Sequence, residues 1–129
     1  MVSSVDYYPT ILELAGVEMP REHVVDGVSI VPLLMQKDKL DREAIYWHYP
    51  HFSNQGGMPG GAVRAGDYKL IEFYEDGALE LYNLKDDISE TRNLAAEMPE
   101  KAKELHAWLA AWRKSVDATM PPPNPDYRP

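Results

Sequence analysis

The chain has 129 residues, 44% of them hydrophobic and 26% charged, which is an ordinary composition for one globular domain. Its net charge of −8 disfavours nucleic acids and anionic membranes as partners, because both attract cationic surfaces. Having no cysteine, it can form neither disulfides nor thiolate metal sites. No run approaches the roughly 18 apolar residues of a membrane span, and no secretory leader is visible.

The first 41 residues favour short helices. Asp6 is placed to cap a helix, Pro9 falls in its first turn, and Gly16 follows its last apolar residue, Ala15. A second short helix is predicted from Ser29 to Met35. The first helix is strongly apolar for its length, so it needs a surface to pack against.

Between residues 42 and 119 the pattern first changes to that of strands. Strand candidates are residues 43–50, 62–65, 68–74 and 79–84, with glycine-containing turns between the last three. The first of these segments is apolar on both sides, which predicts a strand covered on both faces. Four short strands with tight turns predict a small, mostly antiparallel sheet.

A long helix is predicted from Pro99 to about Val116. Its apolar side chains recur at steps of three and four and form one stripe, wide enough to cover a face of the sheet. The predicted fold class is therefore α+β: a small four-stranded, mostly antiparallel sheet packed against a long C-terminal helix, with short N-terminal helices. Residues 120–129 include five prolines and are expected to form an extended tail.

Five short segments of the sequence occur in the same order as similar segments near the C-terminus of one enzyme family. They are VDYYPTILELAG (5–16), DGVSIVPLL (26–34), RAGDYKLI (64–71), ELYNLKDD (80–87) and ETRNLA (90–95). Spread over almost the whole chain, they resemble the C-terminal part of type I sulfatases, members of the alkaline phosphatase superfamily. The resemblance implies that residues 1–41 join a missing N-terminal catalytic domain, that 42–119 form the sulfatase C-terminal subdomain, and that 120–129 are a proline-rich tail.

The catalytic motif of that family is absent from this chain. Sulfatases of this type cleave sulfate esters with a formylglycine made from the first residue of Cys/Ser-x-Pro-x-Arg, beside a divalent cation, usually calcium. The chain has no cysteine, and none of its serines begins such a motif. The resemblance therefore assigns no catalytic residue here: the chain alone is expected to be inactive, and its parent would need calcium and a formylglycine.

Polar and aromatic residues gather after the first predicted strand. His51, Asn54 and Gln55 are the leading candidates for the rim of a substrate pocket, followed by His48 and Arg64. Histidine can bind an anionic group or protonate a leaving oxygen, and neighbouring aromatic rings can stack on sugars. The alternative is structural, with His48 hydrogen-bonded in the sheet and the loop a simple connection.

No metal site is predicted. The two histidines at positions 48 and 51 lack further ligands at suitable spacing. Asp86, Asp87 and Glu90 do not follow the spacing of a calcium loop, so they are expected to serve a turn and helix capping.

The sequence thus predicts the C-terminal subdomain of a sulfatase whose parent hydrolyses a sulfate monoester, with a carbohydrate suggested by the aromatic and polar loop. Two alternatives stay open: the same piece of a phosphate or phosphonate ester hydrolase, and a stand-alone interaction or oligomerisation module. The resemblance to periplasmic and secreted enzymes implies an exported parent. Without its catalytic domain, the chain would expose Ile11, Leu12 and Leu14, which predicts a homo-oligomer.

Overall fold

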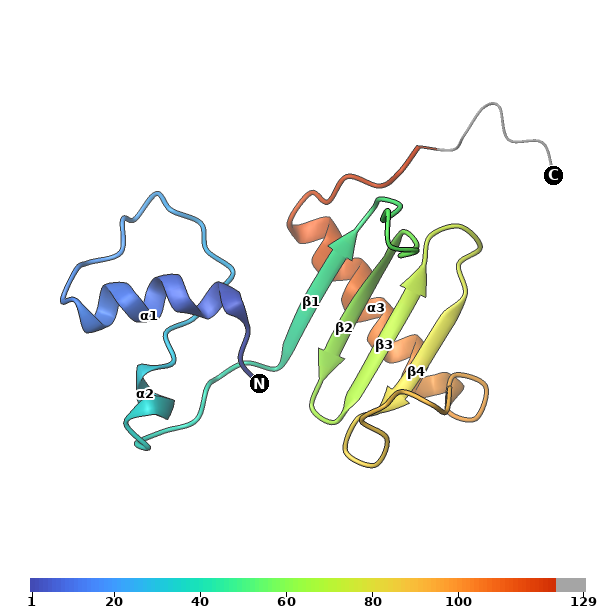
Figure 1. Ribbon diagram of the computed structural model, residues 1–129, viewed down its shortest axis with the longest axis horizontal. Coiled ribbons are helices and arrows are strands. Elements are labelled where there is room, and N and C mark those ends of the chain that lie inside the picture. Colours follow the sequence, from blue (N-terminus) through green and yellow to red (C-terminus); the bar gives the residue numbers. More distant parts are fainter. Residues whose placement is uncertain (123–129) are drawn as a thin grey trace. The chain divides into compact units, whose positions relative to one another are not determined.

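The computed structural model describes residues 1–122, and the chain divides into two compact units, Met1–Glu43 and Ala44–Pro129, which are considered separately (Figure 1). Most of the proline-rich tail predicted for residues 120–129 lies outside the described residues. Within residues 1–122, no helix combines the length and apolar character needed to cross a membrane.

The first unit contains a 3-10 turn, η1 (Ser4–Asp6), and two helices, α1 (Tyr7–Leu14) and α2 (Val31–Leu34). As the sequence predicts, α1 ends at a glycine. Gly16 has a φ of 66°, and its amide and that of Val17 donate to the carbonyls of Glu13 (3.1 Å) and Leu12 (2.9 Å). This pair of bonds satisfies carbonyls at the end of the helix, which is the Schellman arrangement.

Asp6 is the centre of the first unit and, as predicted, occupies the N-cap position of α1. Helical turns already begin at Ser4, and the Asp6 side chain makes no cap hydrogen bond to α1. Its fully buried carboxylate instead accepts from the amides of Ser3 (2.7 Å) and Val28 (3.0 Å) and from both terminal nitrogens of Arg42. The hydrogen bond from Arg42 holds the pKa of Asp6 well below its usual range.

Two further contacts join residues 27–30 to the start of the chain, one to α1 and one to η1. The Thr10 hydroxyl donates to the Asp6 carbonyl (2.6 Å) and accepts from the Ile30 amide (3.0 Å). Gly27 comes so close to η1 that an added Cβ would lie 2.0 Å from the carbonyl oxygen of Val5. Because Ile30 is held in this way at the N-cap position, α2 is shorter than the predicted 29–35.

The second unit is a four-stranded antiparallel sheet backed by one helix, which confirms the predicted α+β fold (Figure 1). The elements are β1 (Ala44–Tyr49), β2 (Gly60–Ala65), β3 (Tyr68–Phe73), β4 (Leu79–Asn83) and α3 (Pro99–Ser115). The strands lie side by side in chain order, because each connection is a hairpin.

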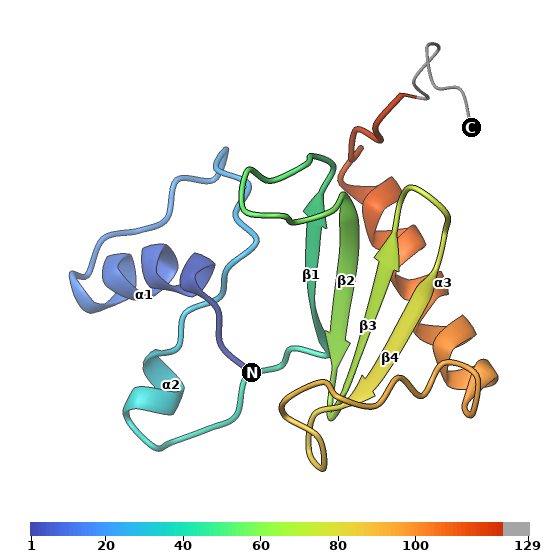
Figure 2. The ribbon, with the colours of Figure 1, turned by 45° about the vertical axis from the view of Figure 1, so that its right-hand side comes forward.

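One face of the sheet packs on α3 (Figures 1 and 2). A central row across the strands, Tyr46, Val63, Leu70 and Leu81, lies on this face, and its last three members are 0% exposed. Ala102, Leu105 and Leu109 of the predicted apolar stripe complete the buried core. The Trp112 ring stacks on Tyr46, with centroids 5.0 Å apart, so this tryptophan belongs to the helix–sheet packing.

The opposite face of the sheet carries no helix of the second unit (Figure 2). Trp47 and Tyr49 lie on this face and are 45% and 49% exposed. The sequence predicts a first strand covered on both sides, but the unit has one long helix and that helix packs on the side of Ala44 and Tyr46. The face is therefore open within the second unit.

Replacing Asp6 with Asn should lower the free energy of unfolding by about 3 kcal/mol, because it removes the charge that balances Arg42, whose side chain is only 10% exposed. Urea unfolding measures this loss. The control is Asp26→Asn, which removes the same charge from an exposed carboxylate of the same unit and should change stability by less than about 0.5 kcal/mol. Equal effects of the two substitutions would contradict the assigned role of Asp6.

The loss should also depend on pH. The pKa of Asp6 is lower in the folded than in the unfolded chain, so its contribution is complete above the ordinary aspartate pKa of about 4 and decreases as the pH falls below it. The difference between the wild type and Asp6→Asn should accordingly narrow in acid.

Candidate functional site

The loop between β1 and β2 is a compact turn organised by Ser53. The Ser53 amide donates to the Gly57 carbonyl (2.9 Å), and its carbonyl accepts from the Gly56 amide (3.1 Å). The Ser53 hydroxyl accepts from the Gln55 amide (3.0 Å). These bonds use backbone groups and one hydroxyl, so they shape the loop without engaging the neighbouring amide side chains.

The predicted rim residues of this loop are exposed. The side chains of Asn54 and Gln55 make no hydrogen bond within residues 1–122. His51 is exposed, and its ring meets Tyr49 edge to face, with centroids 5.6 Å apart. Phe52, at 69% exposure, adds a second accessible ring. The loop thus presents free amides, an imidazole and aromatic faces, which suits a ligand with hydroxyl groups and an apolar ring face.

His48 lies apart from these residues, on the side of the sheet that faces α3. Its Nδ1 lies 2.6 Å from the Tyr74 hydroxyl, and its Nε2 donates to the Thr119 carbonyl (2.9 Å). A carbonyl can only accept, so Nε2 carries the proton, and in the neutral ring Nδ1 accepts from Tyr74. Both ring nitrogens are therefore engaged in joining β1 to the chain that follows β3 and α3.

A group of charged residues supports this end of the sheet. Arg113 of α3 donates to Glu72 of β3 and lies over the Tyr74 ring, 5.3 Å from its centroid. His106 Nε2 lies 3.1 Å from the other carboxylate oxygen of Glu72. Burial would raise the pKa of Glu72, but the hydrogen bond from Arg113 and the close contact with His106 outweigh it and hold this pKa below its usual range.

The sequence analysis does not identify this group, although two signals mark it. Glu72 lies two residues after buried Leu70 on β3, so both belong to the same face of the sheet. Arg113 lies four residues after buried Leu109, so both belong to the same side of α3. Charged residues on faces that are otherwise apolar indicate a buried ion pair. Gly61 is part of the same arrangement, because an added Cβ would lie 2.4 Å from the Tyr74 hydroxyl.

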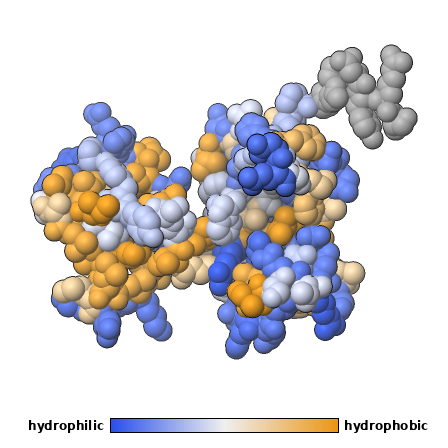
Figure 3. Space-filling model, viewed as in Figure 1, coloured by the Kyte–Doolittle hydropathy of each residue, from blue (hydrophilic) through white to orange (hydrophobic). Residues whose placement is uncertain are grey.

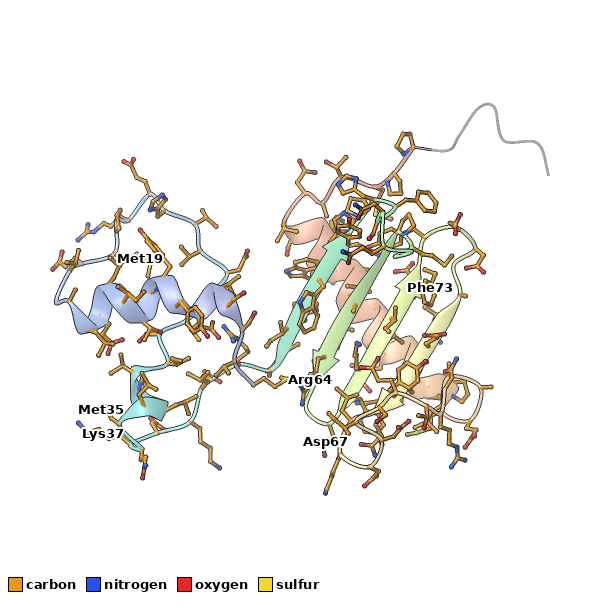
Figure 4. All side chains as sticks on the ribbon, viewed as in Figure 1. Met19, Met35, Lys37, Arg64, Asp67 and Phe73 are labelled. Carbon is orange, nitrogen blue, oxygen red and sulfur yellow. The ribbon has the colours of Figure 1, made fainter. Side chains whose placement is uncertain are left out.

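Arg64 lies apart from both His48 and His51. It pairs in register with Ile45 and Lys69, near the turn between β2 and β3, on the open face (Figure 4). His48 points to the other face, and the β1–β2 loop follows the other end of the strands. The five predicted site residues therefore fall into three places: the loop, the helix side of the sheet and the open face.

The acidic residues after β4 build a turn. Asp87 accepts hydrogen bonds from the amides of Thr91 (2.8 Å) and Arg92 (2.9 Å), and Glu90 pairs with Lys69 at 2.7 Å. Within the described part of the chain, no three His, Asp or Glu side chains are grouped so that they could hold a metal ion.

The first unit has a different surface, which is apolar (Figure 3). Ile11 and Leu14 of α1 are 63% and 64% exposed. The same unit has an open hollow of about 290 Å³, lined mainly by apolar side chains that include Leu12, Val17 and Met19.

The comparisons with known proteins agree with this architecture, a small α+β domain that presents a loop at one end of its sheet. Residues 1–115 match the family model described as N-sulphoglucosamine sulphohydrolase, C-terminal. The chain belongs to this family and is a sulfatase C-terminal domain, as the resemblance of its sequence implies.

The relatives are much longer than this chain. A sulfatase of Formosa agariphila is 37% identical over 125 residues, which cover 86% of this chain and 23% of the relative. The structure of BT4656 in complex with its substrate D-glucosamine-2-N,6-O-disulfate is 34% identical, with a TM-score of 0.72, and the match covers 87% of this chain and 24% of that one. The chain therefore spans about a quarter of the length of these relatives.

A phosphonate monoester hydrolase from Silicibacter pomeroyi has the same fold, with a TM-score of 0.66 at 22% identity over 88% of this chain and 25% of that one. At this identity the likeness concerns the fold alone. The fold by itself therefore does not separate sulfatases from this kind of hydrolase.

Replacing His48 with Phe should loosen the segment after α3, because the Thr119 carbonyl loses its donor. Backbone amides of residues 116–120 should exchange with deuterium roughly fivefold faster, as expected for the loss of one hydrogen bond. His51→Phe makes the same change in the loop and should leave this exchange unaltered. If both variants behaved alike, the contact with His48 would not be what holds the segment.

Proposed function

We propose that this chain is the C-terminal domain of a longer sulfatase and that its β1–β2 loop forms part of the rim of the substrate pocket. The observation that carries the proposal is that the loop is held by Ser53 while its amide side chains, Asn54 and Gln55, have no partner within residues 1–122. Exposed polar groups on a loop set by a rigid sheet are a common arrangement for ligand recognition.

The chemistry would be divided between the two parts of the longer protein. The catalytic part would supply the formylglycine and the calcium site, and this chain would supply neither. The C-terminal domain would contact the sugar portion of the substrate that extends beyond the sulfate group. His51 would contact an anionic or hydroxyl group, the amides would bond to hydroxyls, and the exposed ring of Tyr49 would pack on an apolar face.

The proposed substrate class is a sulfated carbohydrate. BT4656, about a quarter of which this chain matches in fold and sequence, has D-glucosamine-2-N,6-O-disulfate as its substrate. A sugar presents hydroxyl edges and apolar ring faces together, which matches the groups on the loop. The net charge of −8 repels polyanions at long range, so recognition would depend on contacts at the rim.

The phosphonate ester alternative is supported by the shared fold of the Silicibacter pomeroyi enzyme. Reading the DNA upstream of Met1 in the same frame separates the possibilities. An open frame with Cys/Ser-x-Pro-x-Arg supports a sulfatase, and a different nucleophile context supports the phosphonate enzyme. A stop codon preceded by a ribosome-binding site supports a stand-alone interaction module. The protein made from the complete frame is then assayed with sulfated glucosamine and with a phosphonate monoester.

In that complete protein, His51→Ala and Asn54→Ala should each raise KM for the sulfated sugar up to about tenfold, the effect of losing one hydrogen bond, with little change in kcat. Ser89→Ala, an exposed change in the loop after β4, serves as the control and should alter neither constant. Unchanged KM in both loop variants would remove the loop from the substrate rim.

The exposed apolar surface of α1 also supports the proposal that the 129-residue chain associates with itself when the catalytic part is absent. Ile11→Glu should shift the chain toward monomer in light scattering, because it places a charge on this surface. Val24→Glu is the control, since Val24 is 96% exposed and lies outside the helix. A wild-type chain that stays monomeric at high concentration would contradict the proposal.

A further inference from the structure

The β1–β2 loop contains no residue with a permanent charge. Residues 50–59 include no lysine, arginine, aspartate or glutamate, in a chain of which 26% is charged, and His51 is their only ionisable side chain. The exposed groups of the loop are the amides of Asn54 and Gln55 and the ring of Phe52. Such groups suit hydroxyls, acetamido groups and apolar ring faces, and they include no permanent cation to pair with a carboxylate or a sulfate.

A neighbouring turn adds negative charge beside this loop. The β3–β4 turn lies at the same end of the sheet (Figure 1), and the Tyr74 amide donates to the Pro59 carbonyl (3.0 Å), which ties the two connections together. Glu75 and Asp76 follow in the turn, and both are exposed. The Glu75 carboxylate makes no hydrogen bond or ion pair within residues 1–122. Its charge therefore acts on any ion that approaches the loop.

The cations at this end of the sheet have acidic neighbours of their own. Arg113, near the end of α3, donates to Glu72, so its charge is already balanced. Lys114 is exposed, but Asp117, three residues later, carries the opposite charge. The carboxylates of the β3–β4 turn are therefore not neutralised by these groups, and the chain as a whole has a net charge of −8.

We propose that the sugar unit that reaches this loop is uncharged. The complete protein would accordingly prefer a saccharide whose sulfated sugar is joined to a neutral unit over one in which it is joined to a uronate or to a second sulfated unit. The proposal rests on the proposed function and specifies the substrate of the same site. In water, a unit charge about 10 Å from another changes an equilibrium constant roughly twofold, so two carboxylates disfavour an acidic unit about fourfold at low salt.

The test uses the product of the complete reading frame and two disaccharides. Both contain the same sulfated glucosamine, and they differ only at C6 of the second sugar, which is a hydroxymethyl group in glucose and a carboxylate in glucuronate. The ratio of their kcat/KM values measures the preference, because the sulfate and the linkage are shared. The ratio should be about fourfold in favour of the glucose compound at an ionic strength of about 0.01 M and should approach one at about 0.5 M sodium chloride, where the charges are screened.

Substitution of Glu75 identifies the source of the preference. For the glucuronate compound, Glu75→Gln should raise kcat/KM about twofold and Glu75→Lys about fourfold, with no change for the glucose compound. Asp76 is left intact, because its carboxylate accepts from the Ala78 amide (2.9 Å) and shapes the turn. The control is Glu100→Gln, which removes the same charge at the start of α3, at the other end of the sheet (Figure 1), and should alter neither value.

Three results would overturn the proposal. They are equal kcat/KM values for the two disaccharides, a preference for the glucuronate compound, and a preference for the glucose compound that neither salt nor the Glu75 substitutions change. The last would mean that another part of the protein selects the sugar by its shape.

These results differ from failure of the proposed function. A complete protein without activity on either disaccharide would contradict the proposed function and the preference with it. Unchanged KM in His51→Ala and Asn54→Ala would remove the loop from the substrate rim. An active sulfatase whose KM depends on the loop, but which accepts both disaccharides equally, would leave the function standing and remove the preference alone.

Discussion

The packing of α3 against one face of the sheet is the interaction on which the rest of the second unit depends. Val63, Leu70 and Leu81 meet Leu105 and Leu109 there, and all five are 0% exposed. Complete burial of each such side chain contributes about 1.5–3 kcal/mol before the entropy of ordering is subtracted. Since one helix covers one face, the same packing leaves the other face open and lets the β1–β2 loop project from a rigid end.

That rigid end is maintained by polar contacts of a different kind. Glu72, Arg113, Tyr74 and His48 join β1, β3 and α3 and hold the chain at Thr119. These side chains contact one another, whereas the side-chain amides of Asn54 and Gln55 in the adjacent loop make no hydrogen bond within residues 1–122. The division between a supporting group and a free loop is the physical basis for the proposal that the loop, rather than His48, contacts the substrate.

The sequence predicts those parts of the fold that depend on local pattern. The alternation of the strands, the apolar stripe of α3 and the glycine that ends α1 are all local signals, and the structure confirms them. The ion pair of Asp6 with Arg42 could not be predicted, because the two residues lie 36 positions apart in the chain. The partners of His48 are 26 and 71 residues away, so their contacts could not be read from spacing either. Side-chain exposure of the loop follows from the structure, while its contact with a substrate stays a proposal.

The most direct test of the account is carbene footprinting of the 129-residue chain and of the complete protein, with labelling resolved by residue. The account expects His51 and Phe52 in the loop to be labelled in both proteins, and to lose labelling in the complete protein when a sulfated sugar is added. A loop that the sugar does not protect in the complete protein would contradict it.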